Sequence, residues 1–173
     1  MNGQDIRARL SERFGAAVVA AHAEHGDDTV VVALAALPEV LRFCRDDAAL
    51  RCDMLMDLTA VDYLTYPGRE DAARFEVVYH LYSVPHNHRV RIKAGVDEDN
   101  PVVPTAAPVW PIANWLEREV WDMYGIRFPG HPDHRRLFMY DEFVGHPLRK
   151  DYPVDKRQPL TEERDPIEVG WRV

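Results

Sequence analysis

Apolar residues recur at three- to four-residue spacing in three parts of the chain, which predicts three amphipathic helices. The first covers residues 5–14 and ends before Gly15. The second begins at Pro38, because proline is favoured in the first turn of a helix. The third covers residues 112–124. Each of them presents an apolar face that must pack against another element.

Strand-like segments lie between these helices. Residues 17–21 and 29–35 are apolar and β-branched and flank a turn-like HGDD, which predicts a β-hairpin. Three more strands are predicted in succession at residues 54–64, 75–84 and 88–96. The last of them alternates apolar with charged residues, so one of its faces should be solvated.

The order helix, hairpin, helix, three strands, helix predicts an α+β fold, a two-layer domain with a mostly antiparallel sheet and flanking helices, over residues 1–124. Residues 125–173 form a long irregular C-terminal extension, because Pro, Gly and charged residues interrupt every short apolar group there. This extension is too rich in aromatic residues for a disordered tail. We therefore expect it to become ordered by packing on a partner subunit.

The last predicted helix carries a carboxylate in an unusual place. Glu119 falls inside an apolar stripe formed by Ile112, Trp115, Leu116, Val120 and Met123. A buried Glu119 needs a partner, and Arg135 or Arg136 downstream would form a structural ion pair with it. The alternative is that Glu119 lies at the edge of the stripe and is solvated. Trp121 and Tyr124 point away from the stripe, which is typical of an interface.

Composition and charge narrow the classes of partner. The apolar content of 46% is sufficient for a hydrophobic core, and the net charge of −8 argues against nucleic acid or an anionic membrane as a partner. No signal-like apolar region and no run of 18 uncharged apolar residues occurs, so we expect synthesis and residence in the cytoplasm. Cys44 and Cys52 lack metal-site spacing and are expected to be free thiols.

Short segments in the same order over nearly forty residues resemble those of a known family. They read ERE (117–119), DMYGI (122–126), GHP (130–132), RRL (135–137), Asp141 and GHPLRKDYP (145–153), with DLTAVDY (57–63), FEVVYHLYS (75–83) and Asn87-His88 upstream. These segments are similar to the C subunit of bacterial NADH:quinone oxidoreductase, the counterpart of the 30-kilodalton subunit of mitochondrial respiratory complex I.

The resemblance implies a cofactor-free, non-catalytic structural subunit of the peripheral arm, on the cytoplasmic side of the cell membrane. Its partners would be the quinone-site subunit (D or 49-kilodalton type) and the terminal iron–sulfur subunit (B type), with FMN and the iron–sulfur clusters in other subunits. It would meet the membrane only through the complex. The chain itself contains no GxGxxG, Walker, C-x-x-C or H-E-x-x-H motif.

The same resemblance implies that the C-terminal extension drapes over a neighbouring subunit. The candidate interface residues are Trp121, Tyr124, His131, Arg135, Arg136, Phe138, Tyr140, His146, Arg149, Lys150 and Tyr152. The basic residues among them would pair with an acidic partner surface, or else form a solvated charge cluster.

Two alternatives stay open. One is an equivalent subunit of a related ferredoxin- or deazaflavin-dependent quinone oxidoreductase or of a membrane-bound hydrogenase, since the electron donor docks on other subunits. The other is a stand-alone zinc hydrolase that uses His131, His134, His146 and Asp133. Pro132 disfavours the zinc site, because it breaks the helical spacing between the first two histidines.

Overall fold

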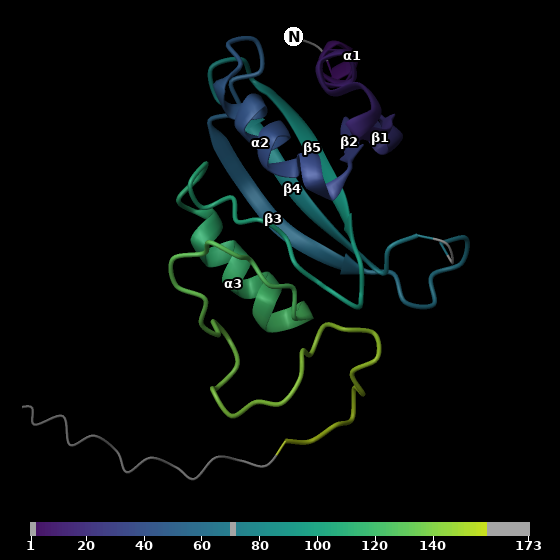
Figure 1. Cartoon of the computed structure of the whole chain (residues 1–173), viewed down its shortest axis with the longest axis vertical. Coiled ribbons are helices and arrows are strands. Elements are labelled where there is room, and N and C mark those ends of the chain that lie inside the picture. Colours follow the sequence, from purple (N-terminus) through teal and green to yellow (C-terminus); the bar gives the residue numbers. More distant parts are fainter. Residues whose placement is uncertain (1–2, 70–71, 159–173) are drawn as a thin grey trace, which may run out of the picture.

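The computed structural model describes residues 3–69 and 72–158 of the chain. Its helices and strands are α1 (Gly3–Phe14), β1 (Val18–His22), β2 (Thr29–Val32), α2 (Leu37–Asp46), β3 (Met54–Asp62), β4 (Phe75–Ser83), β5 (His88–Val96) and α3 (Ala113–Tyr124) (Figure 1). Short 3-10 turns cover Gly15–Ala17, Glu24–Gly26 and Leu34–Ala36. Residues 159–173, the last part of the predicted extension, lie outside the described residues.

The five strands form one mixed sheet in the order β1-β2-β5-β4-β3. Every pair of neighbours is antiparallel except β2 and β5, which run parallel. The chain crosses from β2 to β3 through α2, and this crossover carries it from one side of the sheet to the far edge. The predicted α+β fold with a mostly antiparallel sheet is confirmed.

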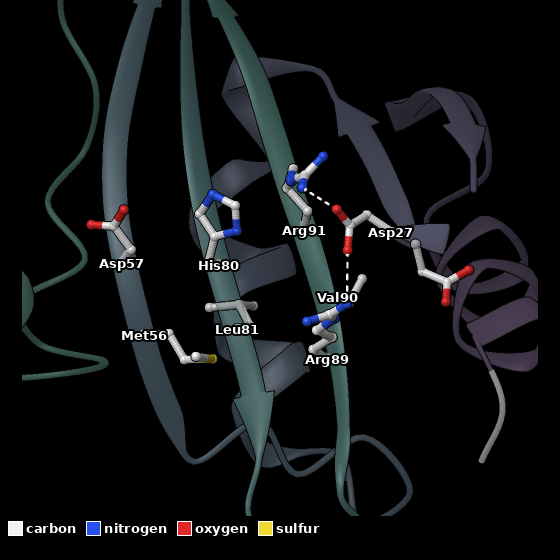
Figure 2. A pocket seen from close by; sticks show the side chains of 9 residues that line it. Asp27, Met56, Asp57, His80, Leu81, Arg89, Val90 and Arg91 are labelled. Carbon is white, nitrogen blue, oxygen red and sulfur yellow. Dashed lines mark hydrogen bonds and ion pairs between the residues drawn. The ribbon is translucent and has the colours of Figure 1, made fainter. Parts of the chain in front are cut away.

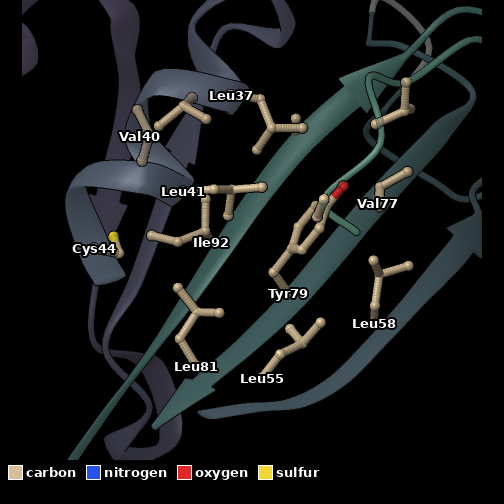
Figure 3. Packing of buried hydrophobic residues seen from close by; sticks show 14 of the residues in the cluster. Leu37, Val40, Leu41, Cys44, Leu55, Leu58, Val77, Tyr79, Leu81 and Ile92 are labelled. Atoms are coloured by element: carbon tan, nitrogen blue, oxygen red, sulfur yellow. The ribbon is translucent and has the colours of Figure 1, made fainter. Parts of the chain in front are cut away.

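The hydrophobic core lies between the helices and one face of the sheet. From α2, Leu41 and Cys44 face Tyr79 and Ile92 in the central strands β4 and β5 (Figure 3). The residues of the connection between β5 and α3 that enter the same core are Val103, Ala106 and Trp110. Cys44 and the other cysteine, Cys52, are buried free thiols. In the described part of the chain, no helix is both long and apolar enough to cross a bilayer.

The predicted apolar stripe of α3 is only partly correct. Trp115 is 55% exposed, whereas Glu117 and Asp122 are buried. The reason is that α3 is covered on two sides, by the sheet and by the segment that returns after the helix, so that burial does not follow a single stripe.

The core also continues beyond the predicted boundary at Gly125. Ile126 and Phe128 are both buried, and Arg127 bridges to Val102 in parallel fashion. Gly125 itself ends α3 with φ 79°, and an added Cβ there would lie 2.7 Å from the ring of His146. The buried core of the domain therefore includes residues up to at least Phe128.

Candidate functional site on the C-terminal segment

Residues 126–158, here called the C-terminal segment, are irregular in backbone yet closely attached to the domain (Figure 1). The backbone N–H of Val103 donates to Arg127 O at 2.9 Å, and that of Arg127 donates to Pro101 O at 2.8 Å. Further on, the N–H of Leu148 donates to Met123 O at 3.1 Å, which brings the segment back to the end of α3. The segment thus forms a loop that returns over its own helix.

Asp122 of α3 is the centre of the first attachment point. Its carboxylate is fully buried and accepts hydrogen bonds from three successive backbone N–H groups, those of residues 137–139, at 2.8 to 3.1 Å. Arg136 Nη1 lies 2.6 Å from the same carboxylate. Burial alone would raise the pKa of Asp122, but these N–H donors and the guanidinium outweigh it and hold the pKa below its usual range.

Two more side chains fasten the segment to α3. The Arg118 guanidinium donates to the carbonyl oxygens of Arg135 and Arg136 at 3.0 and 2.9 Å. His146 Nδ1 donates to the backbone carbonyl of Asp122 at 3.0 Å. Contacts therefore run in both directions between the helix and the segment, and they satisfy backbone groups that regular structure would otherwise pair.

A second attachment point lies at the ends of β3 and β4. The side chain of Arg74 is 6% exposed and bridges the fully buried Asp62 at 2.8 Å to Asp151 of the segment at 2.9 Å, with Glu98 as a third carboxylate partner. The backbone N–H of Lys150 also donates to Asp62 at 2.8 Å. Burial raises the pKa of Asp62, but Arg74 and the backbone N–H groups of Lys150 and Leu64 outweigh it and lower the pKa.

Glu117 is a third buried carboxylate, and it has no cationic side chain bound to it. It accepts hydrogen bonds from Thr105 Oγ1 and the backbone N–H of Ala106, both at 2.6 Å. The ring of His131 is buried 3.9 Å away and donates through Nε2 to the carbonyl of Asn114 at 2.9 Å. Burial raises the pKa of Glu117 to about 7, against the opposing effect of its two donors.

Because of Glu117, the free energy of unfolding is expected to fall between pH 4.5 and pH 7. The folded state holds this proton more tightly than the unfolded chain, whose glutamate has a pKa of 4.5, so the contribution is complete below pH 4.5 and lost by about pH 7. The loss should be about 3 kcal/mol, from roughly 2.5 pKa units. Urea unfolding across this range should show it in the wild type, and a Glu117→Gln variant with the same slope would contradict it.

The candidate interface residues fall into two groups. Four are exposed, namely Arg135, Phe138, Tyr140 and Lys150. Seven are half-buried against the chain itself, namely Trp121, Tyr124, His131, Arg136, His146, Arg149 and Tyr152. Trp121 was expected to point into the open, but its ring lies 4.5 Å from that of His134, because the segment covers this side of α3.

The expected ion pair of Glu119 with Arg135 or Arg136 is wrong for this structure. Arg136 pairs with Asp122, and Arg135 pairs with Asp133 at 2.6 Å. Glu119 is half-buried without an ion pair among the described residues, and its pKa is raised by burial and by the nearby charge of Asp57. The carboxylate that binds the segment is one turn further along the helix than expected.

The histidines of the suggested zinc site serve different contacts. His131 and His146 donate to backbone carbonyls of α3, and His134 accepts from the N–H of Phe128 at 3.3 Å. Among residues 3–69 and 72–158, no group of three or more His, Cys, Asp or Glu could hold a metal ion. A hydrolytic centre therefore has no assembled ligand set in this part of the chain.

The open face of the sheet carries a cavity of about 390 Å³ (Figure 2). Asp27 neutralises both arginines that line it, Arg91 at 2.8 Å and Arg89 at 3.1 Å. His80 and Asp57 lie on the neighbouring strands, directly opposite each other in the β3/β4 register. The charged groups are thus largely paired with each other, which leaves Asp57 as an exposed carboxylate without an ion pair in the described residues.

A small α+β domain that fastens an irregular segment to its surface, with aromatic side chains outward, is typical of a subunit of a larger assembly. The chain belongs to the family described as the 30-kilodalton subunit of respiratory-chain NADH dehydrogenase, which it matches over residues 30–158.

Relatives in this family share about half of the sequence. The chain is 51% identical over 152 residues to the C subunit of NADH-quinone oxidoreductase from Caulobacter vibrioides, covering 88% of this chain and 72% of that protein. It is 45% identical over 146 residues to the protein of the same name from Geobacter sulfurreducens, covering 84% and 86%.

Two solved structures share the fold. A trypsin-resistant fragment of Nqo5 (1–134) is 32% identical with a TM-score of 0.67, covering 77% of this chain and 99% of the fragment. A chain of the membrane-bound sulfane sulfur reductase, an archaeal respiratory membrane complex, is 20% identical with a TM-score of 0.70, covering 94% of this chain and 98% of that one. The second likeness shows the fold alone.

Proposed function

We propose that the chain is a structural, non-catalytic subunit of the peripheral arm of a proton-translocating NADH:quinone oxidoreductase. It supports the quinone-site subunit (D or 49-kilodalton type) and the terminal iron–sulfur subunit (B type) while electrons pass from NADH to quinone. FMN and the iron–sulfur clusters belong to other subunits, and the chain lies on the cytoplasmic side of the membrane without inserting into it. Relatives that carry the name of the C subunit of NADH-quinone oxidoreductase support this role.

One observation carries the proposal: the C-terminal segment is fixed to the domain, yet it exposes large apolar side chains. The exposed fractions are 59% for Phe138, 65% for Val144 and 49% for Leu148. Ordering large apolar side chains toward water does not stabilise a monomer. Exposed apolar side chains are instead typical of a surface that binds a partner. Because Asp122 and Arg74 already order the segment, a partner would not have to supply all of that ordering free energy.

Other electron donors are less well supported. The curated relatives at 45% to 51% identity carry the name NADH-quinone oxidoreductase, while the likeness to the sulfane sulfur reductase chain is at 20% identity. A complex that takes electrons from ferredoxin or a reduced deazaflavin is therefore the second choice for this chain.

Placing a charge on the exposed apolar side chains is expected to abolish assembly without unfolding the chain. Phe138→Asp and Leu148→Asp should each lower the amount of chain recovered in the detergent-extracted complex at least tenfold, since a buried unpaired charge costs several kcal/mol. Thermal unfolding of the isolated chain should be unchanged, because both side chains already face solvent. Recovery is measured by co-purification with a tagged quinone-site subunit.

Val19→Asp is the matched control, because Val19 is 68% exposed on the far edge strand β1. It should assemble like the wild type. Assembly of the Phe138 and Leu148 variants at wild-type yield would show that the segment is not the docking surface. An isolated chain that bound flavin, or zinc in stoichiometric amount, would contradict the non-catalytic role.

A further inference from the structure

The outer side of helix α3 carries three side chains that stay open to solvent. Ile112, at the start of the helix, is 49% exposed, Trp115 is 55% exposed, and Glu119 is half-buried. In an α-helix of about 3.6 residues per turn, Glu119 lies about 20° from Ile112 and about 40° from Trp115 around the helix axis. The three side chains are therefore neighbours on one face, which is here called the α3 stripe.

The C-terminal segment borders the α3 stripe. Arg118, one turn beyond Trp115, donates to two backbone carbonyl oxygens of the segment at 3.0 and 2.9 Å. Its guanidinium carbon also lies 5.0 Å from the Trp115 ring, which holds the indole in place. Asp122 lies two turns beyond Trp115, on the same line of the helix, and accepts the N–H of the exposed Phe138 at 2.8 Å. The stripe is thus continuous with the surface proposed for docking.

Glu119 has no counter-charge within the described part of the chain. Arg118 precedes it directly but is directed toward the carbonyl oxygens of the segment. Arg135 and Arg136 form their ion pairs with other carboxylates. Glu119 is therefore a partly desolvated carboxylate beside an exposed indole, and a cation from another chain can pair with it.

The chemistry of the stripe specifies what can cover it. An arginine fits best, because its guanidinium can form two parallel hydrogen bonds with the carboxylate while its methylene groups pack on the indole. Apolar side chains on either side of that arginine match Ile112 and Trp115. A second copy of this chain fits poorly, since a symmetric contact between two stripes would bring one Glu119 near the other and supply no cation.

We propose that the α3 stripe is a second docking surface, which receives an apolar segment of a neighbouring subunit whose arginine pairs with Glu119. The apolar side chains next to that arginine cover Trp115 and Ile112, and the contact continues into the surface around Phe138. Glu119 then acts in the choice of partner and contributes little to the stability of the free chain. The proposal rests on the proposed role as a subunit of a larger complex.

Photo-crosslinking from Trp115 identifies the occupant. Trp115 is replaced by photoreactive benzoylphenylalanine, the detergent-purified complex is irradiated, and the cross-linked peptide is identified by mass spectrometry. We expect a segment of a neighbouring subunit with an arginine close to the cross-linked position. The same replacement at Val19 on β1 is the control for non-specific cross-linking. A cross-link to a segment without arginine, to a second copy of this chain or to no protein at all would overturn the proposal.

Charge reversal tests the role of the carboxylate. Glu119→Arg should lower recovery with a tagged quinone-site subunit at least about tenfold, because it sets two cations against each other in a contact that excludes water. The urea midpoint of the isolated chain should not change, since Glu119 has no ion pair to lose in the described structure. The matched control is Glu12→Arg, which makes the same change of charge at an exposed position of α1. Recovery of the Glu119 variant at the level of this control would contradict the pairing.

A charge exchange tests the pair itself. The arginine next to the cross-linked position is changed to glutamate, which should lower recovery with the wild-type chain and restore it with Glu119→Arg. If the exchange restores nothing, the arginine does not pair with Glu119.

The two proposals fail in different ways. If the wild-type chain never co-purifies with a quinone-site subunit, the proposed function fails. If it co-purifies normally but Trp115 forms no cross-link in the complex, the function stands and docking on the α3 stripe is excluded.

Discussion

Replacement of Asp122 by asparagine is expected to detach the C-terminal segment from α3 and to lower the free energy of unfolding by about 3 to 5 kcal/mol. The fully buried carboxylate accepts three backbone N–H groups and the Arg136 guanidinium, whose side chain is 14% exposed. An asparagine offers one acceptor and turns an amide donor toward N–H groups. Arg136 is then left with little counter-charge in a mostly buried position.

Urea unfolding of the isolated chain measures the stability change, and limited trypsin digestion reports on the segment. In the variant, cleavage at Arg135 and Arg149 should become faster, since both bonds lie in the detached segment. Glu119→Gln is the control from the same helix, because it also removes one negative charge but breaks no ion pair in the described structure. Its effect should stay within about 1 kcal/mol. Equal losses in the two variants would show that Asp122 is not the attachment point.

Much of the fold could be predicted from periodicity, because the helix or strand preference of each segment is set by its own sequence. Helix and strand positions followed from apolar spacing, and the antiparallel sheet followed from the order of the elements. The parallel pairing of β2 with β5 could not be predicted, since register between distant strands depends on the tertiary fold. Periodicity also failed on α3, where burial arises from two different layers.

The attachment points were missed for a related reason. Asp62, Arg74 and Asp122 are charged, so a sequence pattern places them on the surface. Their burial becomes favourable only through partners that are distant in sequence, such as Asp151, which is 77 residues from Arg74. One signal was available: a helix with several carboxylates, followed by an RR pair and a tract of irregular backbone. That signal predicted an ion pair correctly but assigned it to Glu119.

Chain geometry explains why Asp122 is the carboxylate that binds the C-terminal segment. It precedes Gly125 by three residues, so its carboxylate lies in the last turn of α3, next to where the segment returns and forms a hydrogen bond with Met123 O. Three successive N–H groups can converge on the Asp122 carboxylate because the backbone of the segment is irregular and leaves them free of regular pairing. The absence of regular structure in the segment is thus a condition for this attachment, and the exposed Phe138 and Tyr140 follow directly from the turn that it fixes.

Arg74→Met is expected to lower the free energy of unfolding at pH 7 by about 3 to 5 kcal/mol, because it leaves the fully buried Asp62 without its cation. Asp151 loses one of its two arginine partners and keeps Arg149 at 3.2 Å, so the segment should be held less firmly at this end. Methionine keeps most of the volume over the Phe75 ring, from which the guanidinium carbon lies 4.8 Å. The loss therefore reports charge rather than packing.

The pH dependence separates this charge effect from a packing defect. In the wild type the pKa of Asp62 is lowered from 3.8, so its contribution to stability is present above that value and is lost as the pH falls below it. In Arg74→Met, burial raises the pKa of Asp62, and the carboxylate can take up a proton instead of remaining charged. The difference between variant and wild type should thus be largest at pH 7 and shrink toward pH 4. A second change, Asp62→Asn, should recover part of the loss at pH 7, whereas a pH-independent difference with no recovery would show that Arg74 acts through packing alone.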